Sequence, residues 1–164
     1  MLSPQIPINE ARRHQAVLGL KLLDTAPEAR FDRLARLARE TFSTTIAAIT
    51  LVDHERQWFK AIVGLNTRET SRAVSFCGHT IIQEGCFVVH DTHVDPSFAD
   101  NPLVTDAPKI RFYAGCPIHV GYHRVGALCV INPFPMSFSS ADQGRLLELA
   151  ELVDAELQLC VRGA

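Results

Sequence analysis

Residues 46–63 read IAAITLV, DHER and QWFKAIV, and this stretch decides the fold class. Its two apolar runs are short and rich in β-branched and aromatic residues, which is typical of β-strands. The polar residues 53–56 between them predict a turn. The stretch therefore predicts an antiparallel hairpin.

A second pair of apolar runs follows later in the chain. Residues 111–120 and 124–131 flank Gly121-Tyr122-His123 and predict another hairpin. Pro117 has no N–H group to offer a sheet ladder, so we expect a bulge or an edge position there. Residues 86–90 predict one further strand between the two hairpins.

The middle of the chain also contains segments without strand periodicity. Residues 64–75 predict a loop, and residues 78–83 predict a short helix. Residues 91–109 are dense in Asp, Asn and Pro and are longer than an ordinary connection. We expect them to form a long structured loop, a kind of segment that often takes part in binding.

Helices are predicted before the first strand. Asn9 is suited to cap a helix that runs to about Lys21. Thr25 and Glu28 have the spacing of a capping box, in which each side chain satisfies an otherwise unpaired backbone N–H group. This box would open an amphipathic helix over residues 26–42.

The last predicted helix begins at Ser140, whose spacing to Gln143 again matches a capping box. Its apolar positions follow steps of four and three, which is the pattern of a heptad seam. The seam consists of Leu146, Ala150, Val153, Leu157 and Cys160. It indicates packing against the first helices or against a second copy of the chain, and we favour a parallel homodimer through the terminal helices.

The order of these elements indicates an α+β fold with an antiparallel sheet and the helices gathered on one face. We expect residues 1–164 to form a single domain, because a chain of this length removes roughly 70% of its unfolded surface from water. Its parts would be N-terminal helices at 1–43, sheet and pocket segments at 45–133, and a C-terminal helix at 139–161.

Composition narrows the range of functions. The chain has 16 Lys and Arg residues against 18 Asp and Glu, and the basic residues are scattered, so we expect no nucleic acid or membrane surface as a partner. Residues 1–5 show no secretory leader, and no apolar run approaches the roughly 20 residues that span a bilayer. We therefore predict a cytoplasmic location. The five cysteines are odd in number and lie apart, which predicts reduced thiols and no disulfide.

Motifs of common enzyme classes do not occur in the sequence. It contains no glycine-rich phosphate loop, no Gly-x-Ser-x-Gly elbow and no His-Glu-x-x-His pair. We therefore predict that the chain is not an enzyme, and we assign no catalytic residue, metal or cofactor.

Several segments together carry a family resemblance. They are LDTAPE at 23–28, SFCGH at 75–79, DPSFADNP at 95–102, RFYAG at 111–115 and GALCVI at 126–131. With these segments the chain resembles the GAF domain family, in particular the bacterial subgroup found ahead of diguanylate cyclases and sensor histidine kinases. Two positions depart from the pattern, because Gly78 stands where Ala is expected and Asn132 where Asp is expected.

The resemblance implies a GAF-like fold, related to PAS and profilin folds. In this family an antiparallel sheet of five or six strands carries the N- and C-terminal helices on one face, and any ligand pocket lies on the other face. It also implies a signalling role, exerted through a dimer or through a fused or partner effector.

Polar and aromatic groups of the middle segments are expected to converge over one face of the sheet. Such a mixture is typical of a ligand pocket. The predicted ligand-binding residues are Phe76, Cys77, His79, Asp91, Phe98, Asn101, Arg111 and Tyr113. Arg111 is suited to bind a ligand carboxylate or phosphate, or instead to tie down the loop by pairing with Asp91, Asp95 or Asp100.

Cysteine and histidine in the same region allow two further interpretations. Cys77, His79, Cys86 and His90 are zinc-ligand types, but their spacing matches no known zinc motif, and we favour core packing. Cys77 near His79 also suits an activated thiol, although a buried inert cysteine is the favoured interpretation.

Three functions remain open from the sequence. The first is a regulatory domain that binds an unknown small molecule and signals to an effector domain or partner protein. The second is a thiol-based redox sensor, or an enzyme similar to methionine sulfoxide reductase, that uses Cys77 with Cys86 or Cys116. The third is a dimerisation or protein-docking module without a ligand.

Overall fold

The computed structural model describes residues 1–163, which contain a six-stranded antiparallel sheet in the order β3-β2-β1-β6-β5-β4. The strands are β1 Ile46–Val52, β2 Arg56–Val63, β3 Glu69–Ser71, β4 Phe87–Val89, β5 Phe112–Val120 and β6 His123–Asn132. The α-helices are α1 Glu10–Gly19, α2 Ala29–Phe42, α3 Phe76–Thr80, α4 Pro102–Thr105 and α5 Ser140–Arg162. The predicted α+β fold with an antiparallel sheet is confirmed.

Both predicted hairpins form, as β1–β2 and β5–β6. β1 and β6 also pair with each other, so these two strands occupy the middle of the sheet. All seven residues of β1 are buried because side chains on both of its faces are covered. The two edge strands, β3 and β4, are only three residues long each.

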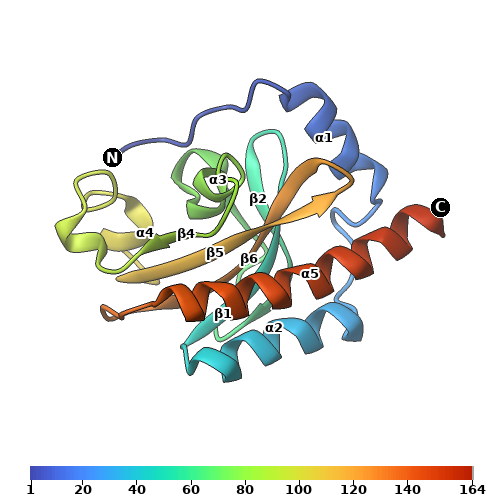
Figure 1. Ribbon diagram of the computed structural model, residues 1–164. Coiled ribbons are helices and arrows are strands. Elements are labelled where there is room, and N and C mark those ends of the chain that lie inside the picture. The colour runs from blue at the N-terminus through green and yellow to red at the C-terminus, as the bar shows by residue number, and fades with distance from the viewer. Residues whose placement is uncertain (164) are drawn as a thin grey trace.

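Helices of very different length cover the two faces of the sheet (Figure 1). α2 and α5, with 14 and 23 residues, lie side by side along one face, which we call the helix face. α3 and α4, with five and four residues, lie over the opposite face together with the loops around them. We call this second face the pocket face.

Each face has its own hydrophobic core, because successive residues of a strand point to opposite sides. On β5, Phe112, Ala114 and Cys116 belong to the helix-face core, whereas Tyr113 belongs to the pocket-face core. The helix-face core also contains the seam residues Leu146, Ala150, Val153 and Leu157.

The seam of α5 is therefore an internal contact. Leu146, Ala150, Val153 and Leu157 are at most 1% exposed inside one chain, and the fifth predicted seam residue, Cys160, is half-buried. Leucines on the other side of the helix are the exposed ones, with Leu152 at 50% and Leu159 at 54%. The seam is thus not available for the predicted dimer, because α2 and β5 of the same chain already cover it.

Two predicted capping boxes are wrong. α2 begins at Ala29 rather than residue 26, and no side chain caps it. The Thr25 hydroxyl and the Glu28 carboxylate instead meet the buried Lys60 ammonium, at 2.8 and 2.7 Å. A buried ammonium needs such partners, and this need overrides the local capping pattern.

The capping box of α5 lies one residue earlier than predicted, at Ser139 and Asp142 instead of Ser140 and Gln143. α1 starts beside Asn9 as predicted, but the Asn9 side chain makes no capping hydrogen bond. The predicted loop at 64–75 contains the short strand β3, which adds to the edge of the sheet beside β2.

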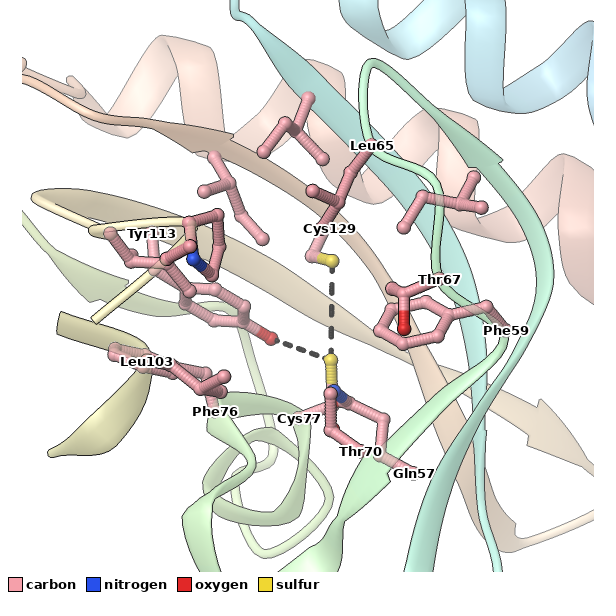
Figure 2. A pocket seen from close by; sticks show the side chains of 16 residues that line it. Gln57, Phe59, Leu65, Thr67, Thr70, Phe76, Cys77, Leu103, Tyr113 and Cys129 are labelled. Atoms are coloured by element: carbon pink, nitrogen blue, oxygen red, sulfur yellow. Dashed lines mark hydrogen bonds between the residues drawn. The ribbon is translucent and has the colours of Figure 1, made fainter.

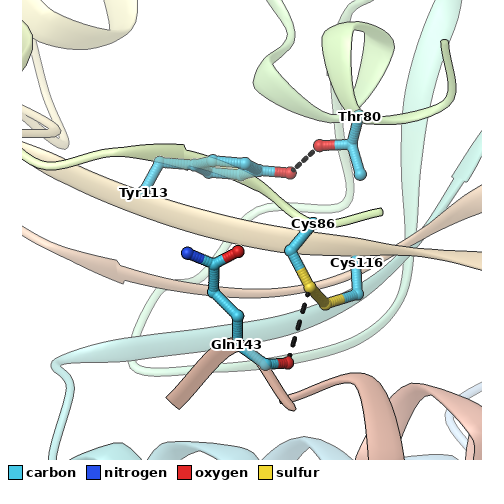
Figure 3. Close-up of a disulfide and its surroundings, with 5 residues drawn as sticks. All are labelled: Thr80, Cys86, Tyr113, Cys116 and Gln143. Carbon is cyan, nitrogen blue, oxygen red and sulfur yellow. Dashed lines mark hydrogen bonds between the residues drawn. A yellow bond between two sulfur atoms is a disulfide. The ribbon is translucent and has the colours of Figure 1, made fainter. Parts of the chain in front are cut away.

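The prediction of reduced cysteines is wrong for one pair. Cys86 and Cys116 form a disulfide, with their Cα atoms 4.2 Å apart. The register pairs Phe87 with Gly115, so the two cysteines lie opposite each other on neighbouring strands. The cross-strand contact was not evident from the sequence because the two cysteines are 30 residues apart. Figure 3 shows the disulfide on the side of β5 that faces α5, and Tyr113 on the other side.

Within residues 1–163, no helix combines the length and the apolar character that a bilayer-spanning segment requires.

Candidate ligand-binding site

A cavity of about 170 Å³ opens in the pocket-face core (Figure 2). Its walls come from strands β1, β2, β3, β5 and β6 and from the segments over them. The lining residues are Ile46, Gln57, Phe59, Ile62, Leu65, Thr67, Thr70, Phe76, Cys77, Leu103, Ala107, Pro108, Ile110, Tyr113, Cys129 and Ile131. The lining contains no Asp, Glu, Lys, Arg or His, so the cavity is suited to neutral molecules.

Gln57 brings an amide into this apolar wall. Its Nε2 donates to the Thr70 hydroxyl at 3.0 Å, while its buried Oε1 has no hydrogen-bond partner. If the amide is turned around, the nitrogen becomes the unpaired atom, so one polar atom of Gln57 is unsatisfied in either orientation. An unsatisfied buried polar atom costs roughly 1–3 kcal/mol.

A hydrogen-bonded group of sulfur and hydroxyl atoms forms another part of the wall. The Tyr113 hydroxyl donates to Cys77 Sγ at 3.2 Å, and it also contacts the Thr80 hydroxyl at 2.7 Å. Cys77 Sγ lies 3.9 Å from Cys129 Sγ. Cys77 is placed by α3, which Ser75 caps with its side chain, and Cys129 lies on the central strand β6.

The pKa values in this group diverge. Burial raises the pKa of Cys77, but hydrogen bonds to Cys129, Thr50 and Tyr113 outweigh burial and lower it below its ordinary value. The hydrogen bond to Cys77, together with burial, raises the pKa of Cys129. Burial and the neighbouring charge of Cys77 raise the pKa of Tyr113. Cys77 is therefore the thiol of the group that ionises first.

The eight predicted site residues fall into separate places. Phe76, Cys77 and Tyr113 line the cavity. His79 and Phe98 do not line it, and they pack against each other edge to face at 4.9 Å between ring centroids. Phe98 also stacks on Phe76 at 4.5 Å, so it supports the cavity wall from behind. Burial lowers the pKa of His79.

The remaining three predicted residues have structural contacts outside the cavity. Arg111 binds the Asp91 carboxylate with two nitrogens, at 3.0 and 3.1 Å, as the loop-anchoring alternative predicted. The Asn101 side chain accepts from Leu103 N and so caps α4, and its amide donates to the Val74 carbonyl. Arg111 thus does not line the cavity, and its guanidinium is paired with Asp91 instead.

Most of the cavity wall was missed by the sequence reasoning. Gln57 and Phe59 alternate on β2, and Cys129 and Ile131 alternate on β6. This two-residue period was the available signal, because it puts each pair on one face of the sheet. It does not tell which face stays partly open. Leu103 and Pro108 come from the long loop, where no period exists.

Gly78 has a packing role that explains the departure from the expected Ala. A Cβ atom at this position would lie 2.7 Å from Pro4 Cγ and 2.6 Å from Ser75 Oγ. The N-terminal segment runs over α3 here, with Leu2 N donating to Ser97 O. Asn132, at the second departure, accepts from Thr45 N at 2.7 Å and so joins the ends of β6 and β1.

The structure separates the cysteines that the sequence reasoning grouped. Cys77 lies on the pocket face, whereas Cys86 and Cys116 are bonded to each other on the helix face. Within residues 1–163 no three His, Cys, Asp or Glu side chains converge as metal ligands. The zinc grouping and a redox pair of Cys77 with Cys86 or Cys116 both fail on this geometry.

Comparisons with known proteins agree with the fold. The sequence model described as the GAF domain matches residues 26–157. A cyclic di-GMP phosphodiesterase of Pseudomonas aeruginosa is 40% identical over 159 residues, which is 96% of this chain. The chain spans only 27% of the length of that relative.

Solved structures with the same fold include two of distant sequence. The free methionine-R-sulfoxide reductase of Neisseria meningitidis has a TM-score of 0.67 at 16% identity, covering 99% of this chain and 98% of that one. The GAF domain of an Acinetobacter phosphoenolpyruvate-protein phosphotransferase has a TM-score of 0.66 at 16% identity, covering 93% and 94%. At this identity the likeness concerns the fold alone.

The prediction that the chain is not an enzyme is contradicted by these findings. The 40% identical relative is named a phosphodiesterase, and one of the structures with the same fold is named a reductase. The lack of a common catalytic motif was the basis of that prediction, and it was too weak a basis for it.

Proposed function

The chain belongs to the GAF domain family, and from this premise we propose that it is a regulatory domain that binds a small, neutral and mainly apolar molecule in the cavity. The carrying observation is a mainly apolar cavity with the amide of Gln57 in its wall. We also propose that residues 1–164 form one such domain in the cytoplasm.

The size of the cavity limits the ligand. A dry apolar cavity of about 150 Å³ in another protein holds a benzene-sized molecule, whereas drug-sized ligands occupy about 300–1,000 Å³. At about 170 Å³ this cavity suits a molecule with a single ring. A cyclic dinucleotide is several times too large, and its phosphates would find no Arg or Lys among the lining side chains.

The output of the domain is proposed from its relative. A chain of this kind forms about a quarter of a protein named for cyclic di-GMP hydrolysis. We propose that ligand binding regulates an effector of this kind, either fused or as a partner. A ligand can do so only if it binds one state of the domain better than the other.

We propose that a homodimer of the chain uses the outer side of α5. Leu152 and Leu159 lie on this side and are half exposed. Changing both to Glu would then convert a dimer to a monomer in light scattering, whereas an unchanged mass would discard this surface.

The ligand proposal is tested by thermal unfolding with a panel of single-ring neutral compounds that carry one amide, hydroxyl or amine group. A compound present at 100 times its Kd stabilises the folded state by about 2.7 kcal/mol. Cyclic nucleotides and cyclic di-GMP serve as anionic comparison compounds, for which we expect no effect through this cavity.

Two variants connect any stabilisation to the cavity. Leu103→Trp places a larger side chain in the cavity wall and should abolish the stabilisation by the compound. Leu37→Trp on the outside of α2 is the matched control. Gln57→Met should weaken compounds with a polar group and spare purely apolar ones. If neutral compounds bind equally well to wild type and Leu103→Trp, the cavity is not their site.

A further inference from the structure

The chain holds a second pair of neighbouring cysteines that is not bonded. Cys77 and Cys129 are both free, buried and 3.9 Å apart between their sulfur atoms. Figure 2 shows both sulfurs in the wall of the cavity, with the Tyr113 hydroxyl directed at Cys77. The two cysteines are 52 residues apart in sequence, so only the fold brings them together.

We propose that Cys77 and Cys129 are a redox site that a small hydroperoxide converts to a disulfide. The site is independent of the ligand proposed above, because it needs only the two thiols and an oxidant small enough to enter the cavity. Both sulfurs line that cavity, which gives hydrogen peroxide a route to side chains that are only 1% exposed on the outer surface.

The surroundings select Cys77 as the attacking sulfur. The thiolate is the nucleophile in such reactions, and hydrogen-bond donors favour it. The Tyr113 hydroxyl points at Cys77 Sγ, and Thr80 holds that hydroxyl from the other side. The opposite pKa directions of the two cysteines agree with this order, since Cys77 ionises more easily and Cys129 less easily than an ordinary thiol.

The reaction then runs in two balanced steps. The Cys77 thiolate attacks one peroxide oxygen, so an S–O bond forms, the O–O bond breaks and hydroxide leaves and takes a proton to become water. Cys129 sulfur next attacks Cys77 sulfur, so the S–S bond forms and the S–O bond breaks, and the departing hydroxide takes the Cys129 proton. Two thiols and one hydrogen peroxide give one disulfide and two waters.

Cys77 and Cys129 differ in how easily their backbone can move to bring the two sulfur atoms together. A disulfide requires its sulfur atoms about 2.0 Å apart, so they must approach by about 2 Å. β6 is held between β1 and β5, whereas α3 is a five-residue helix between loops. The shift therefore falls on α3, and closure of the link would draw it toward the sheet and reduce the cavity.

The test is disulfide mapping of the full chain before and after hydrogen peroxide, with free thiols alkylated during denaturation. Cleavage after Arg, Lys and Glu84 separates Cys77 in residues 73–84 from Cys86, and residues 125–145 carry Cys129. We expect a new link between the peptides 73–84 and 125–145. Cys86–Cys116 serves as the internal reference, and Cys160→Ser is the variant that should leave the new link unchanged.

Two variants test the roles of the residues. Tyr113→Phe should slow formation of the link about threefold to tenfold, because losing a hydrogen bond depletes the thiolate while raising its intrinsic reactivity. Cys129→Ser should leave Cys77 as a sulfenic acid that reacts with dimedone. The proposal is overturned if peroxide leaves both cysteines alkylatable while Cys160 is oxidised, or if Cys77 proceeds to sulfinic acid in the wild type without a link to Cys129.

Discussion

The two faces of the sheet are built from alternate residues of the same strands, and yet they end in different states. The helix face is closed by two long helices and a disulfide. The pocket face is covered by short helices and loops, keeps a cavity of about 170 Å³ and holds its cysteine pair unbonded. The difference lies in what covers the sheet, because the strands supply apolar side chains to both sides.

The largest expected effect tests whether the two faces are packed to different degrees. Phe31 of α2 is fully buried in the helix-face core, so Phe31→Ala should lower the free energy of unfolding by about 3–5 kcal/mol. Phe59 borders the cavity and already lacks packing partners on one side, so Phe59→Ala should cost less, about 2–3 kcal/mol. Urea unfolding measures both, and equal losses would mean equally filled faces.

The next effect concerns the sulfur pair of the helix face. Changing both Cys86 and Cys116 to Ser should lower the free energy of unfolding by about 2–4 kcal/mol, because a link across 30 residues no longer restricts the unfolded chain. Reductant should remove this difference by destabilising only the wild type. A wild type that is insensitive to reductant in urea unfolding would speak against the bond.

The smallest effect concerns the ion pairs of α1. Glu10 of this helix pairs with Arg13 and Arg72, whereas no ion pair lies in the cavity wall. Burial raises the pKa of Glu10, but hydrogen bonds from Arg13 and Arg72 outweigh it and lower the pKa to about 2. The ionised Glu10 therefore stabilises the fold above pH 4.5, and this contribution is lost as the pH falls toward 2.

For Glu10→Gln we expect a loss of about 1 kcal/mol at pH 7, after allowance for solvent screening, and no corresponding loss on acidification. Urea unfolding at pH 7 and pH 3 measures the difference between wild type and variant. The exposed Glu148→Gln is the control. A difference between Glu10→Gln and wild type that stays constant with pH would contradict the assignment.

The comparison of the faces also explains what could be predicted from the sequence. The helix face could be predicted from the sequence because its buried residues recur at regular spacing. The steps of four and three from Leu146 to Leu157 mark the buried side of α5, and the apolar run at 46–52 marks a central strand. These patterns reflect regular elements, whose neighbours in space follow from local spacing.

The pocket face was predicted only in part, because it depends on contacts between distant segments. Phe76, Cys77 and Tyr113 were named for the site, whereas Gln57 and Cys129 were not. Arg111 was equally suited to a ligand or to Asp91, and only the folded structure shows that it binds Asp91. The disulfide was not predicted for the same reason, since the register of β4 and β5 cannot be read from the cysteine spacing.

The short edge strands have a consequence for the behaviour of the protein at high concentration. β3 and β4 offer only three residues each as a template for another chain's backbone, and beyond β4 the neighbouring β5 carries Pro117, which has no N–H group to donate. Long, flat, open edges promote sheet-to-sheet aggregation, and short or proline-bearing ones oppose it. The rim of this sheet thus opposes fibrillar self-assembly.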